Sequence, residues 1–429
     1  MNAGNIVDAF VSDSKWNSVP AKRLFTSSKE INQGMKETNR LALTMKGVIN
    51  RSLDDLQGLQ SSDYSVYQIF EKDDLVFKLI DLENIKTSRV GIVHERGIMS
   101  PAYIRVSANS NSIYPRFYYW YFFALYLTNI YNKLGGGVRQ NLTAGDLLEI
   151  PVPLIDISLQ KQVSTFLDRE TQRIDSLIEE KQTFIKLLKE KRQALISHVV
   201  TKGLNPNVEM QDSGIEWIGQ VPKHWVIRRL KHTSTLQSGI AKGKDNANKE
   251  TLSVPMLRVA NVQDGYVKLD DVHDINVLPH EVERYALKDG DVLMNEGGDN
   301  DKLGRGTVWK EQIKPCIHQN HVFVIRVTDI EPEWLGWLTQ SAYAKFYFFR
   351  VSKQSTNLAS ISSTNVKEVH LLIPPADERK IIMDYLEKQT SKLKLLVQDV
   401  EQSITLLKEH RTSLISAAVT GKIDVREAV

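Results

Sequence analysis

Side chains suited to reading a nucleic acid occur in several predicted loops of this 429-residue chain. Base edges are read by Arg, Lys, Asn and Gln, and phosphates are held by Lys, Arg and small polar groups. The candidates in the first half are Lys78, Lys86, Ser88, Arg89, Arg139, Gln140 and Asn141. Those in the second half are Lys242, Lys244, Asn246, Asn295, Lys302, Arg305, Lys353, Gln354, Ser355 and Asn357. Any one of them alone fits an ordinary solvated surface, but their occurrence at corresponding places in both halves favours contact with DNA.

Motifs for catalysis are missing from the sequence. Methyl transfer to adenine usually needs a Gly-rich loop for S-adenosylmethionine and an (Asn/Asp)-Pro-Pro-aromatic motif. The Pro-Pro pair at 374–375 instead follows Ile373 and precedes Ala376. No GxxxxGK[ST] phosphate loop is present, and the glycines at 135–137 lack a following Lys-Ser/Thr pair. We therefore predict a non-catalytic chain with no cofactor of its own.

Potential metal ligands are present but have the wrong spacing. Cys316, His318 and His321 lie close together in a segment that alternates like a strand, whereas closed zinc sites need four ligands in paired spacing. The polar run 299–301 lacks the spacing of a calcium loop. We predict no metal site.

Composition places the chain among globular proteins with little net charge. It is 41% hydrophobic and 25% charged, with a formal net charge of +3. This charge permits DNA binding without pointing to it, so a basic partner could share the phosphates. The single Cys316 excludes an internal disulfide framework and suits a reducing cytoplasm. The N-terminus does not fit a signal peptide, and the apolar run 117–131 is too short for a membrane span.

The elements that must position these loops are arranged as a repeat. LLKEKRQALISHVVT at 187–201 returns as LLKEHRTSLISAAVT at 406–420, with ten of fifteen positions identical and an offset of 406 − 187 = 219. Because this offset is about half of the chain, we expect two similar halves. A two-fold repeat suits a two-fold target, and duplex DNA is the commonest one.

Each half is expected to end in one long helix. Residues from about 158 to 202 contain no Gly or Pro, and Gly203 and Pro206 follow as terminators. Apolar positions in both helices step by four and three, which is typical of a heptad seam. The seam positions are Ile174, Ile178, Ile185, Leu188, Arg192 and Leu195 in the first helix and Val397, Ile404, Leu407, Arg411 and Leu414 in the second. The two arginines share one seam position, where they either fix the register of the helix pair or extend to solvent at its edge.

A segment of mixed α and β pattern precedes each long helix. Strand-like runs in the first segment are at 75–82, 90–95 and 102–108, followed by a helical run at 117–131. Those in the second are at 253–262, 291–295 and 321–327, followed by a helical run at 334–349. KDDLVFK at 72–78 parallels KDGDVLMN at 288–295, and GGVRQNL at 136–142 parallels KQSTNL at 353–358.

The predicted fold is therefore α/β (α+β): two mixed α/β domains separated by two long antiparallel coiled-coil helices with pseudo-two-fold symmetry. The expected boundaries are 1–153, 154–205, 206–373 and 374–429. A helix of roughly 40 residues is about 60 Å long. Since one turn of DNA is about 34 Å, such a rod would hold two domains against separate half-sites with unread base pairs between them.

The order of these pieces resembles the specificity subunit (HsdS) of type I restriction-modification enzymes over essentially the whole chain. The resemblance is carried by both long helices and by short motifs that precede them. The motifs are PKHWVIRRLK at 222–231, MLRVANVQDG at 256–265, GDVLMN at 290–295, the Asn-Leu pairs at 141–142 and 357–358, IPVP at 150–153 and IPP at 373–375. The first half opens with WNSVPAKRLF at 16–25, a looser form of the PKHW motif, which leaves its first strand less defined.

The resemblance implies two target-recognition domains, each reading one half of a bipartite site in double-stranded DNA. It also implies that the helices dock two methyltransferase (M) subunits, which restriction (R) subunits join. S-adenosylmethionine, ATP and Mg²⁺ would then be bound by the partner subunits. The docking candidates on the outward helix faces are Lys186, Lys189, Glu190, Lys408 and Glu409. A charged solvated face supported by i,i+4 pairs is the alternative for these residues.

Two other functions stay open at this point. One is a coiled-coil protein-interaction scaffold without sequence-specific DNA binding, against which the paired polar loops argue. The other is a self-sufficient methyltransferase, against which the missing motifs argue. Side-chain identity alone does not decode into a base sequence for either half-site.

Overall fold

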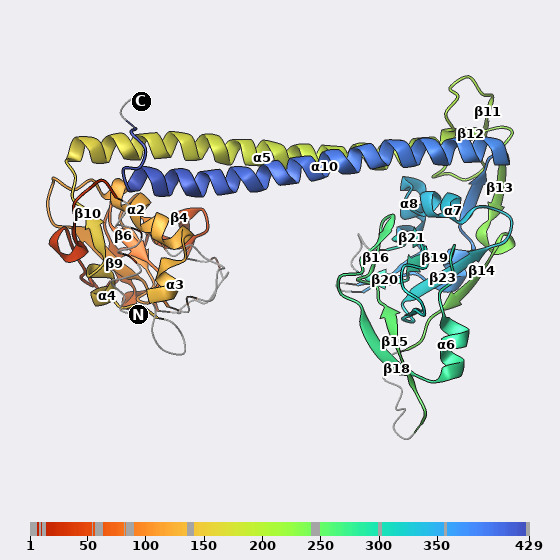
Figure 1. Ribbon diagram of the computed structural model, residues 1–429, viewed down its shortest axis with the longest axis horizontal. Coiled ribbons are helices and arrows are strands. Elements are labelled where there is room, and N and C mark those ends of the chain that lie inside the picture. The colour runs from red at the N-terminus through yellow and green to blue at the C-terminus, as the bar shows by residue number, and fades with distance from the viewer. Residues whose placement is uncertain are drawn as a thin grey trace. The chain divides into compact units, whose positions relative to one another are not determined.

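The computed structural model describes residues 7, 10, 14–53, 55, 63–80, 82, 90–134, 141–241, 249–298, 303–355 and 358–425. The chain forms two compact units (Figure 1). The first unit comprises Met1–Gln182 and Glu401–Val429, and the second comprises Thr183–Val400. Each unit therefore contains one mixed α/β domain together with one part of each long helix.

Two four-stranded sheets form the domain of the first unit. The sheet β2-β9-β6-β7 is antiparallel throughout, whereas the sheet β4-β3-β8-β5 contains the parallel pair β3 and β8. The strands are β2 (Phe25–Thr26), β3 (Arg40–Thr44), β4 (Gly47–Arg51), β5 (Gln68–Phe70), β6 (Leu75–Phe77), β7 (Val90–Ile92), β8 (Gly97–Met99) and β9 (Ile104–Ala108). A further pair, β1 (Ser18–Pro20) with β10 (Pro151–Pro153), brings the start of the domain to its end. The less defined first strand is thus present.

The aromatic helix of the first unit contributes seven buried residues to its core. In α2 (Pro115–Leu127), the rings of Phe117, Tyr118 and Phe122 are at most 1% exposed and pack with the sheet residues in one cluster. One helix over 117–131 was expected, but the structure has α2 followed by α3 (Ile130–Leu134). The break lies at Asn129, whose φ of 57° is incompatible with a continuous right-handed helix. A short α4 (Ala144–Leu148) follows.

The second unit repeats this plan with additional strands. Its sheet β14-β23-β19-β21 is antiparallel like β2-β9-β6-β7, and its sheet β18-β15-β22 contains the parallel pair β15 and β22. The strands are β11 (Met210–Asp212), β12 (Gln220–Pro222), β13 (Val226–Arg229), β14 (Ser234–Ser238), β15 (Leu252–Leu257), β16 (Val262–Gln263), β17 (Tyr266–Val267), β18 (His273–Val277), β19 (Val292–Asn295), β20 (Gly297–Gly298), β21 (Gly306–Val308), β22 (Ile317–His318), β23 (Val322–Val327), β24 (Lys353–Gln354), β25 (Ala359–Ser360) and β26 (His370–Ile373).

The described residues of the second unit also form the shorter helices α6 (Pro279–Tyr285), α7 (Pro332–Thr339), α8 (Ala342–Val351) and α9 (Ser363–Lys367). The single helix expected over 334–349 is wrong, because α7 and α8 are separate. Ser341 ends the first by donating its hydroxyl to the Leu338 carbonyl (2.6 Å) and caps the second by accepting from the Ala344 N–H (3.3 Å).

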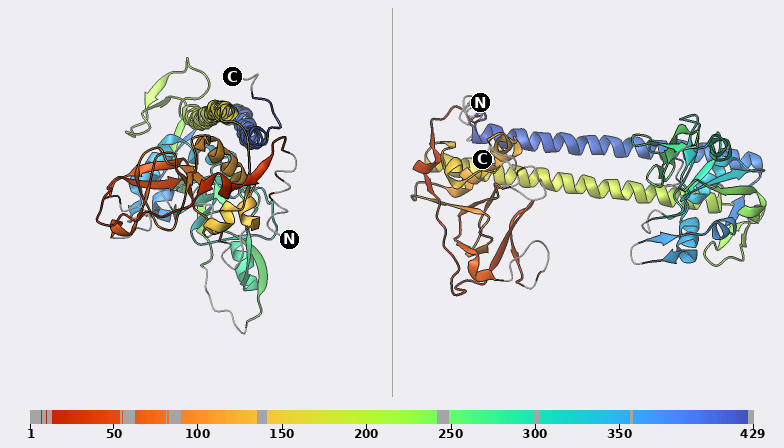
Figure 2. Two further views of the ribbon diagram at one scale, coloured as in Figure 1. Left: turned by 90° about the vertical axis from the view of Figure 1, so that its left-hand side faces the viewer. Right: turned by 90° about the horizontal axis from the view of Figure 1, so that it is seen from below.

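The long helices α5 (Ile157–Lys202) and α10 (Ala376–Val419) contain 46 and 44 residues. Within each unit they lie side by side (Figures 1 and 2). In the first unit, Val163 and Leu167 near the start of α5 share a core with Ile415 and Ala418 near the end of α10. This order makes the helices antiparallel. Among the described residues, no helix is both long enough and apolar enough to cross a membrane.

In the second unit, the end of α5 packs against the start of α10, which is the reverse of the order in the first unit. Ile196 and Val200 pack there with Ile382 and Leu386, and all four are fully buried. The predicted seam positions are less uniform than a heptad pattern suggests. Buried positions are Ile174, Leu188 and Ile404, whereas Ile178, Ile185, Leu195, Val397, Leu407 and Leu414 are only half-buried.

Candidate nucleic-acid interface

An Asp–Arg pair with a buried aspartate contacts the equivalent strand in both units. Asp74, just before β6, accepts from Arg105 Nε through Oδ2 (2.6 Å), and Asp291, just before β19, accepts from Arg326 Nε through Oδ1 (2.7 Å). Each aspartate also accepts a backbone N–H from three residues upstream, at 2.7 and 2.9 Å. The hydrogen bond to Asp291 raises the pKa of Arg326. The same hydrogen bonds therefore hold β6 and β19 in place, and candidate DNA-binding residues follow each of these strands.

A second shared contact lies immediately beyond these strands. The Leu142 N–H donates to the Leu79 carbonyl (2.9 Å), and the Ile361 N–H donates to the Glu296 carbonyl (2.8 Å). Residues 142 and 361 are separated by 219 positions, which is the same offset as between the two copies of the repeated helix sequence. The pair Asn141–Leu142 thus corresponds to Ser360–Ile361. The expected equivalence with the Asn-Leu pair at 357–358 is wrong by three positions.

The next residues in both units confirm this alignment. Thr143 and Ser362, also 219 apart, are the N-caps of α4 and α9, and each accepts a backbone N–H three residues on, from Asp146 and Asn365. Hydroxyl caps fix where a helix begins. The segments that carry Asn141 and Ser360, just before these helices, are therefore built on one plan.

In the first unit, the structure brings Lys78 and Asn141 together. Lys78 directly follows β6 and is half-buried, while Asn141 is exposed, and the bond between Leu142 and Leu79 places their backbones side by side. The other candidates of this half lie outside the described residues. These are Lys86, Ser88, Arg89, Arg139 and Gln140.

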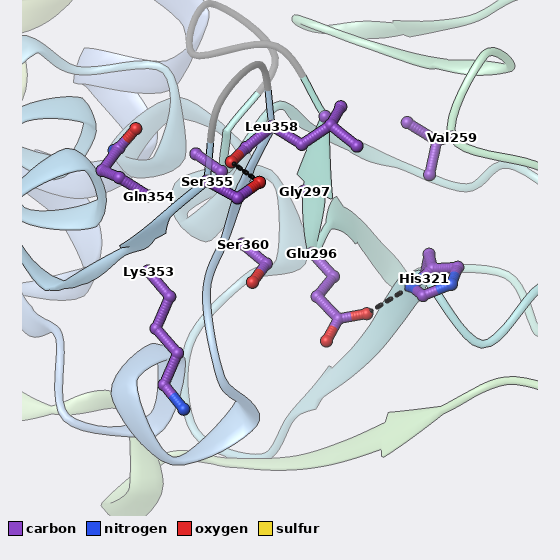
Figure 3. Close-up of a pocket in the computed structure, with 11 residues that line it drawn as sticks. Val259, Glu296, Gly297, His321, Lys353, Gln354, Ser355, Leu358 and Ser360 are labelled. Atoms are coloured by element: carbon purple, nitrogen blue, oxygen red, sulfur yellow. Dashed lines mark hydrogen bonds and ion pairs between the residues drawn. The ribbon is translucent and has the colours of Figure 1, made fainter.

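In the second unit, Lys353, Gln354 and Ser355 surround a cavity of about 500 Å³ (Figure 3). All three are exposed. The first two form β24, which pairs with β25, and β25 pairs in turn with β20. The candidates that lie outside the described residues here are Lys242, Lys244, Asn246, Lys302 and Asn357.

Two further residues of this cavity were not predicted. His321 Nδ1 lies 2.7 Å from Glu296 Oε2, although 25 residues separate the two in sequence. Glu296 directly follows β19, and His321 directly precedes β23. The antiparallel pairing of these strands brings the two side chains together. Only the position of each residue at the end of an apolar run could have indicated this from the sequence.

Asn295 and Arg305 do not occupy the exposed loop positions expected of them. Asn295 is the last residue of β19 and is 1% exposed, and its amide nitrogen donates to the carbonyls of Val259 (3.2 Å) and Val262 (3.1 Å). The loop-tip position predicted for Asn295 is wrong, because the neighbouring backbone buries and binds its amide. Arg305 is half-buried and donates to Gln263 Oε1 (2.9 Å).

The helix-face candidates are exposed on both helices. Lys186, Lys189 and Glu190 lie on the part of α5 in the second unit, and Lys408 and Glu409 lie on the part of α10 in the first unit. The pair Lys186–Glu190 is separated by 3.9 Å and both side chains are at least 60% exposed, so it adds little stability. These positions are free for a partner as far as the structure describes them.

The seam arginines bind the domains as well as the helices. Arg411 Nε lies 2.9 Å from Asp175 Oδ1, and its guanidinium carbon lies 5.9 Å from the centre of the Phe123 ring on α2. Arg192 Nη2 donates to Gln340 Oε1 at the end of α7 (2.6 Å), and burial lowers the pKa of Arg192. Each arginine thus connects a long helix to the domain of its own unit. The two predicted roles, fixing the register of the helix pair and extending to solvent, did not include this contact.

The cysteine–histidine segment is structural in this fold. Burial raises the pKa of the Cys316 thiol to about 12 and lowers the pKa of His318 to about 4. The ring of His318 is held by the Val322 carbonyl, which lies 2.7 Å from Nδ1. Within the described ranges, no group of three or more His, Cys, Asp or Glu side chains is placed to hold a metal ion.

The structure contains two similar mixed α/β domains, each with polar side chains at the end of one central strand, and two long helices. Residues 15–187 match the family model described as type I restriction modification DNA specificity domain. The predicted resemblance to type I specificity subunits is confirmed.

Relatives among characterised proteins agree with this family. The chain is 23% identical over 305 residues to the EcoKI specificity subunit of Escherichia coli (strain K12), covering 70% of this chain and 63% of that subunit. It is 22% identical over 289 residues to the StySPI specificity subunit of Salmonella potsdam, covering 65% of this chain and 58% of the relative. The chain thus spans about three fifths of the length of these relatives.

Solved structures confirm the fold class. A chain from a study of complex assembly and conformational transition of the type I R-M system superposes with a TM-score of 0.70 at 15% identity, covering 95% of this chain and 98% of that one. The HsdS subunit from Thermoanaerobacter tengcongensis gives a TM-score of 0.51 at 15% identity, covering 95% and 97%. Two mixed α/β domains with two long helices are therefore the fold of this protein.

Proposed function

We propose that this chain is the non-catalytic DNA-specificity subunit of a type I restriction-modification complex, in which each unit reads one half of a bipartite site. The observation that carries the proposal is that equivalent positions in the two units have different side chains. At the equivalent strand end and backbone bond, the first unit has Lys78, Leu79 and Asn141, whereas the second has Asn295, Glu296 and Ser360. One framework with two different polar surfaces suits two different half-sites.

The helix faces support a second part of the proposal, the docking of two copies of one methyltransferase subunit. Leu187 and Leu406 are equivalent in the repeat, and they are 55% and 57% exposed. Each begins the same sequence Leu-Leu-Lys-Glu, so an apolar side chain and the same charges recur in both units. A repeated surface of this kind suits one partner bound twice. S-adenosylmethionine, ATP and Mg²⁺ would be bound by the methyltransferase and restriction subunits.

The DNA-specificity function is tested by the methylome of cells with and without this chain, in the presence of its methyltransferase partner. Loss of one split motif, two short half-sites with a fixed gap, would support the proposal and give the target. Partner subunits that still assemble on the chain while no motif depends on it would instead establish the protein-interaction scaffold. Loss of a continuous motif would contradict recognition by two separate units.

The docking surface is tested by Leu187→Asp and Leu406→Asp, analysed by native mass spectrometry of the complex. Each single variant should lose one of two methyltransferase copies and the double variant both, because a buried charge without a partner opposes association. Leu395→Asp is the matched control: Leu395 is 61% exposed on α10, but Ser176 occupies its equivalent position. Full stoichiometry in the double variant would contradict this surface.

A further inference from the structure

The cavity of the second unit contains one feature that ordinary phosphate binding does not require, a fixed carboxylate (Figure 3). Glu296 is 27% exposed and its partner His321 is 56% exposed. Both belong to the second unit, as does Lys353 on the neighbouring strand β24. A role for these residues in reading a base rests on the proposed function in DNA recognition.

Part of the cavity's lining is backbone without side chains. β20 consists of two glycines, Gly297 and Gly298, which pair with β25. A Cβ added at Gly297 would come within 2.5 Å of the Ala359 carbonyl oxygen, so a side chain at this position would disrupt the sheet. Glycine permits close approach of a ligand to the backbone. A flat edge such as that of a base can therefore reach Glu296 without displacing a side chain from this strand.

Glu296 is held rigidly in place. Its backbone N–H donates to the His321 carbonyl (2.9 Å), and its own carbonyl accepts from the Ile361 N–H (2.8 Å). Its Oε2 lies 2.7 Å from His321 Nδ1, and the other ring nitrogen lies 3.4 Å from the amide of Asn320. With the Nδ1 proton donated to Glu296, one carboxylate oxygen is engaged. The second oxygen, Oε1, is then an oriented acceptor.

The charges around this acceptor indicate what it would bind. Lys353 and Gln354 are exposed donors on strand β24, which lines this cavity, and none of the ion pairs found among the described residues includes Lys353. Such donors suit phosphates and base acceptors. A carboxylate is repelled by phosphates, so in this cavity it is favourable only opposite a hydrogen-bond donor of the DNA. In the major groove those donors are the exocyclic amines, N4 of cytosine and N6 of adenine.

We propose that Glu296, oriented by His321, reads the exocyclic amine of one base in the second half-site, while Lys353 holds an adjacent phosphate. At the equivalent position of the first unit, Leu79 takes the place of Glu296 and is 1% exposed. Recognition of an amine by a carboxylate at this position is thus expected in the second half-site only.

Glu296→Gln tests this proposal in the complete complex, with the methylated motif determined by long-read sequencing. The side chain keeps its shape, but a glutamine amide prefers the N6 and N7 atoms of adenine. If the wild-type base is cytosine, preference at one position of the second half-site should move toward adenine by roughly ten- to hundredfold. If it is adenine, that base should be retained. In that case His321→Gln, which leaves Glu296 unoriented, should relax the preference at this same position.

Controls separate this proposal from the proposed function. Glu283→Gln, at an exposed site on α6 of the same unit, should leave the motif unchanged. Lys353→Ala should weaken DNA binding for all sequences and reduce its salt dependence. A wild-type chain that directs no split motif would overturn the function itself. A normal split motif that neither Glu296→Gln nor His321→Gln alters, or one altered in the first half-site, would overturn only the reading by Glu296.

Discussion

The two units share their internal framework and differ in the side chains that the framework presents. Both contain an Asp–Arg pair before the central strand, a backbone bond from the following turn, and a hydroxyl cap on the next helix. At the same place, however, the first unit has the buried Leu79 and the second has the half-buried Glu296. The framework contacts and the differing side chains are therefore at different positions, so under the proposed function recognition can change without a change of fold.

The opening segment of each domain also belongs to the framework that the two units share. Trp16 packs 5.9 Å from Phe117, ring centre to ring centre, and Trp225 packs 6.2 Å from Trp334. Each tryptophan also lies against the glycine that ends a long helix, Gly421 in the first unit and Gly203 in the second. The looser opening motif of the first half therefore makes the same contact as the PKHW motif of the second.

The largest difference between the units should follow from removing the aspartate of each Asp–Arg pair. In the first pair both side chains are at most 10% exposed, whereas Arg326 of the second is 32% exposed. Asp74→Ala should destabilise the first unit by about 3 kcal/mol, because it leaves the nearly buried Arg105 with only the half-exposed Glu30, at 3.7 Å, as an ionic partner. Asp291→Ala should cost the second unit less, about 2 kcal/mol, because water reaches its arginine.

Hydrogen exchange measured by mass spectrometry reports the stability of each unit separately within the full chain. Each substitution should increase exchange in its own unit and leave the other unchanged. Equal costs for the two substitutions would show that the exposure of the arginine does not decide the energy of the pair.

The units should also respond differently to acid. His318 on β22 is buried, and burial lowers its pKa from 6.5 to about 4, whereas the corresponding strand β8 carries Met99. Between these two values the unfolded chain binds a proton that the folded chain does not, so stability falls as pH drops from 6.5 to 4. The loss approaches about 3 kcal/mol for the second unit.

The test is the pH dependence of unfolding in His318→Met, which copies the residue of the first unit. This variant should lose most of the acid sensitivity between pH 6.5 and 4, together with a constant cost of about 1 kcal/mol from the unpaired Val322 carbonyl. The same slope in wild type and variant would contradict the role of His318.

The smallest expected difference concerns the helix-terminating glycines. Gly421 and Gly203 have φ values of 69° and 74°, so alanine is strained at both. A Cβ at 421 would come within 2.6 Å of Trp16, whereas one at 203 would stay 3.3 Å from Trp225. Gly421→Ala should therefore cost about 1–2 kcal/mol more than Gly203→Ala in thermal unfolding. Equal costs would mean that Trp16 moves aside freely.

Much of the fold could be predicted from the sequence, because long apolar periodicities determine it. The first long helix was expected at about 158–202 and is found at 157–202, and the strand at 291–295 is found at 292–295. The breaks at Asn129 and Ser341 were missed, because helix periodicity continues across both. A positive φ or a hydroxyl cap within an apolar run has no strong signal in sequence.

The candidate site was less predictable than the fold. Lys353 and Gln354 were found as exposed polar residues of a turn, which composition indicates. Asn295 was misplaced because the carbonyls that bind its amide come from residues more than 30 positions away. Glu296 and His321 were missed for the same reason: their contact exists only after β19 and β23 pair.

Independent recognition of separate half-sites by the two units is tested most directly by a domain exchange. Residues 1–150 would be replaced by the corresponding segment of a relative, and the methylated motif would be determined with the methyltransferase partner present. We predict that one half of the split motif changes, while the other half and the gap are retained. A change in both halves, or in the length of the gap, would contradict independent recognition.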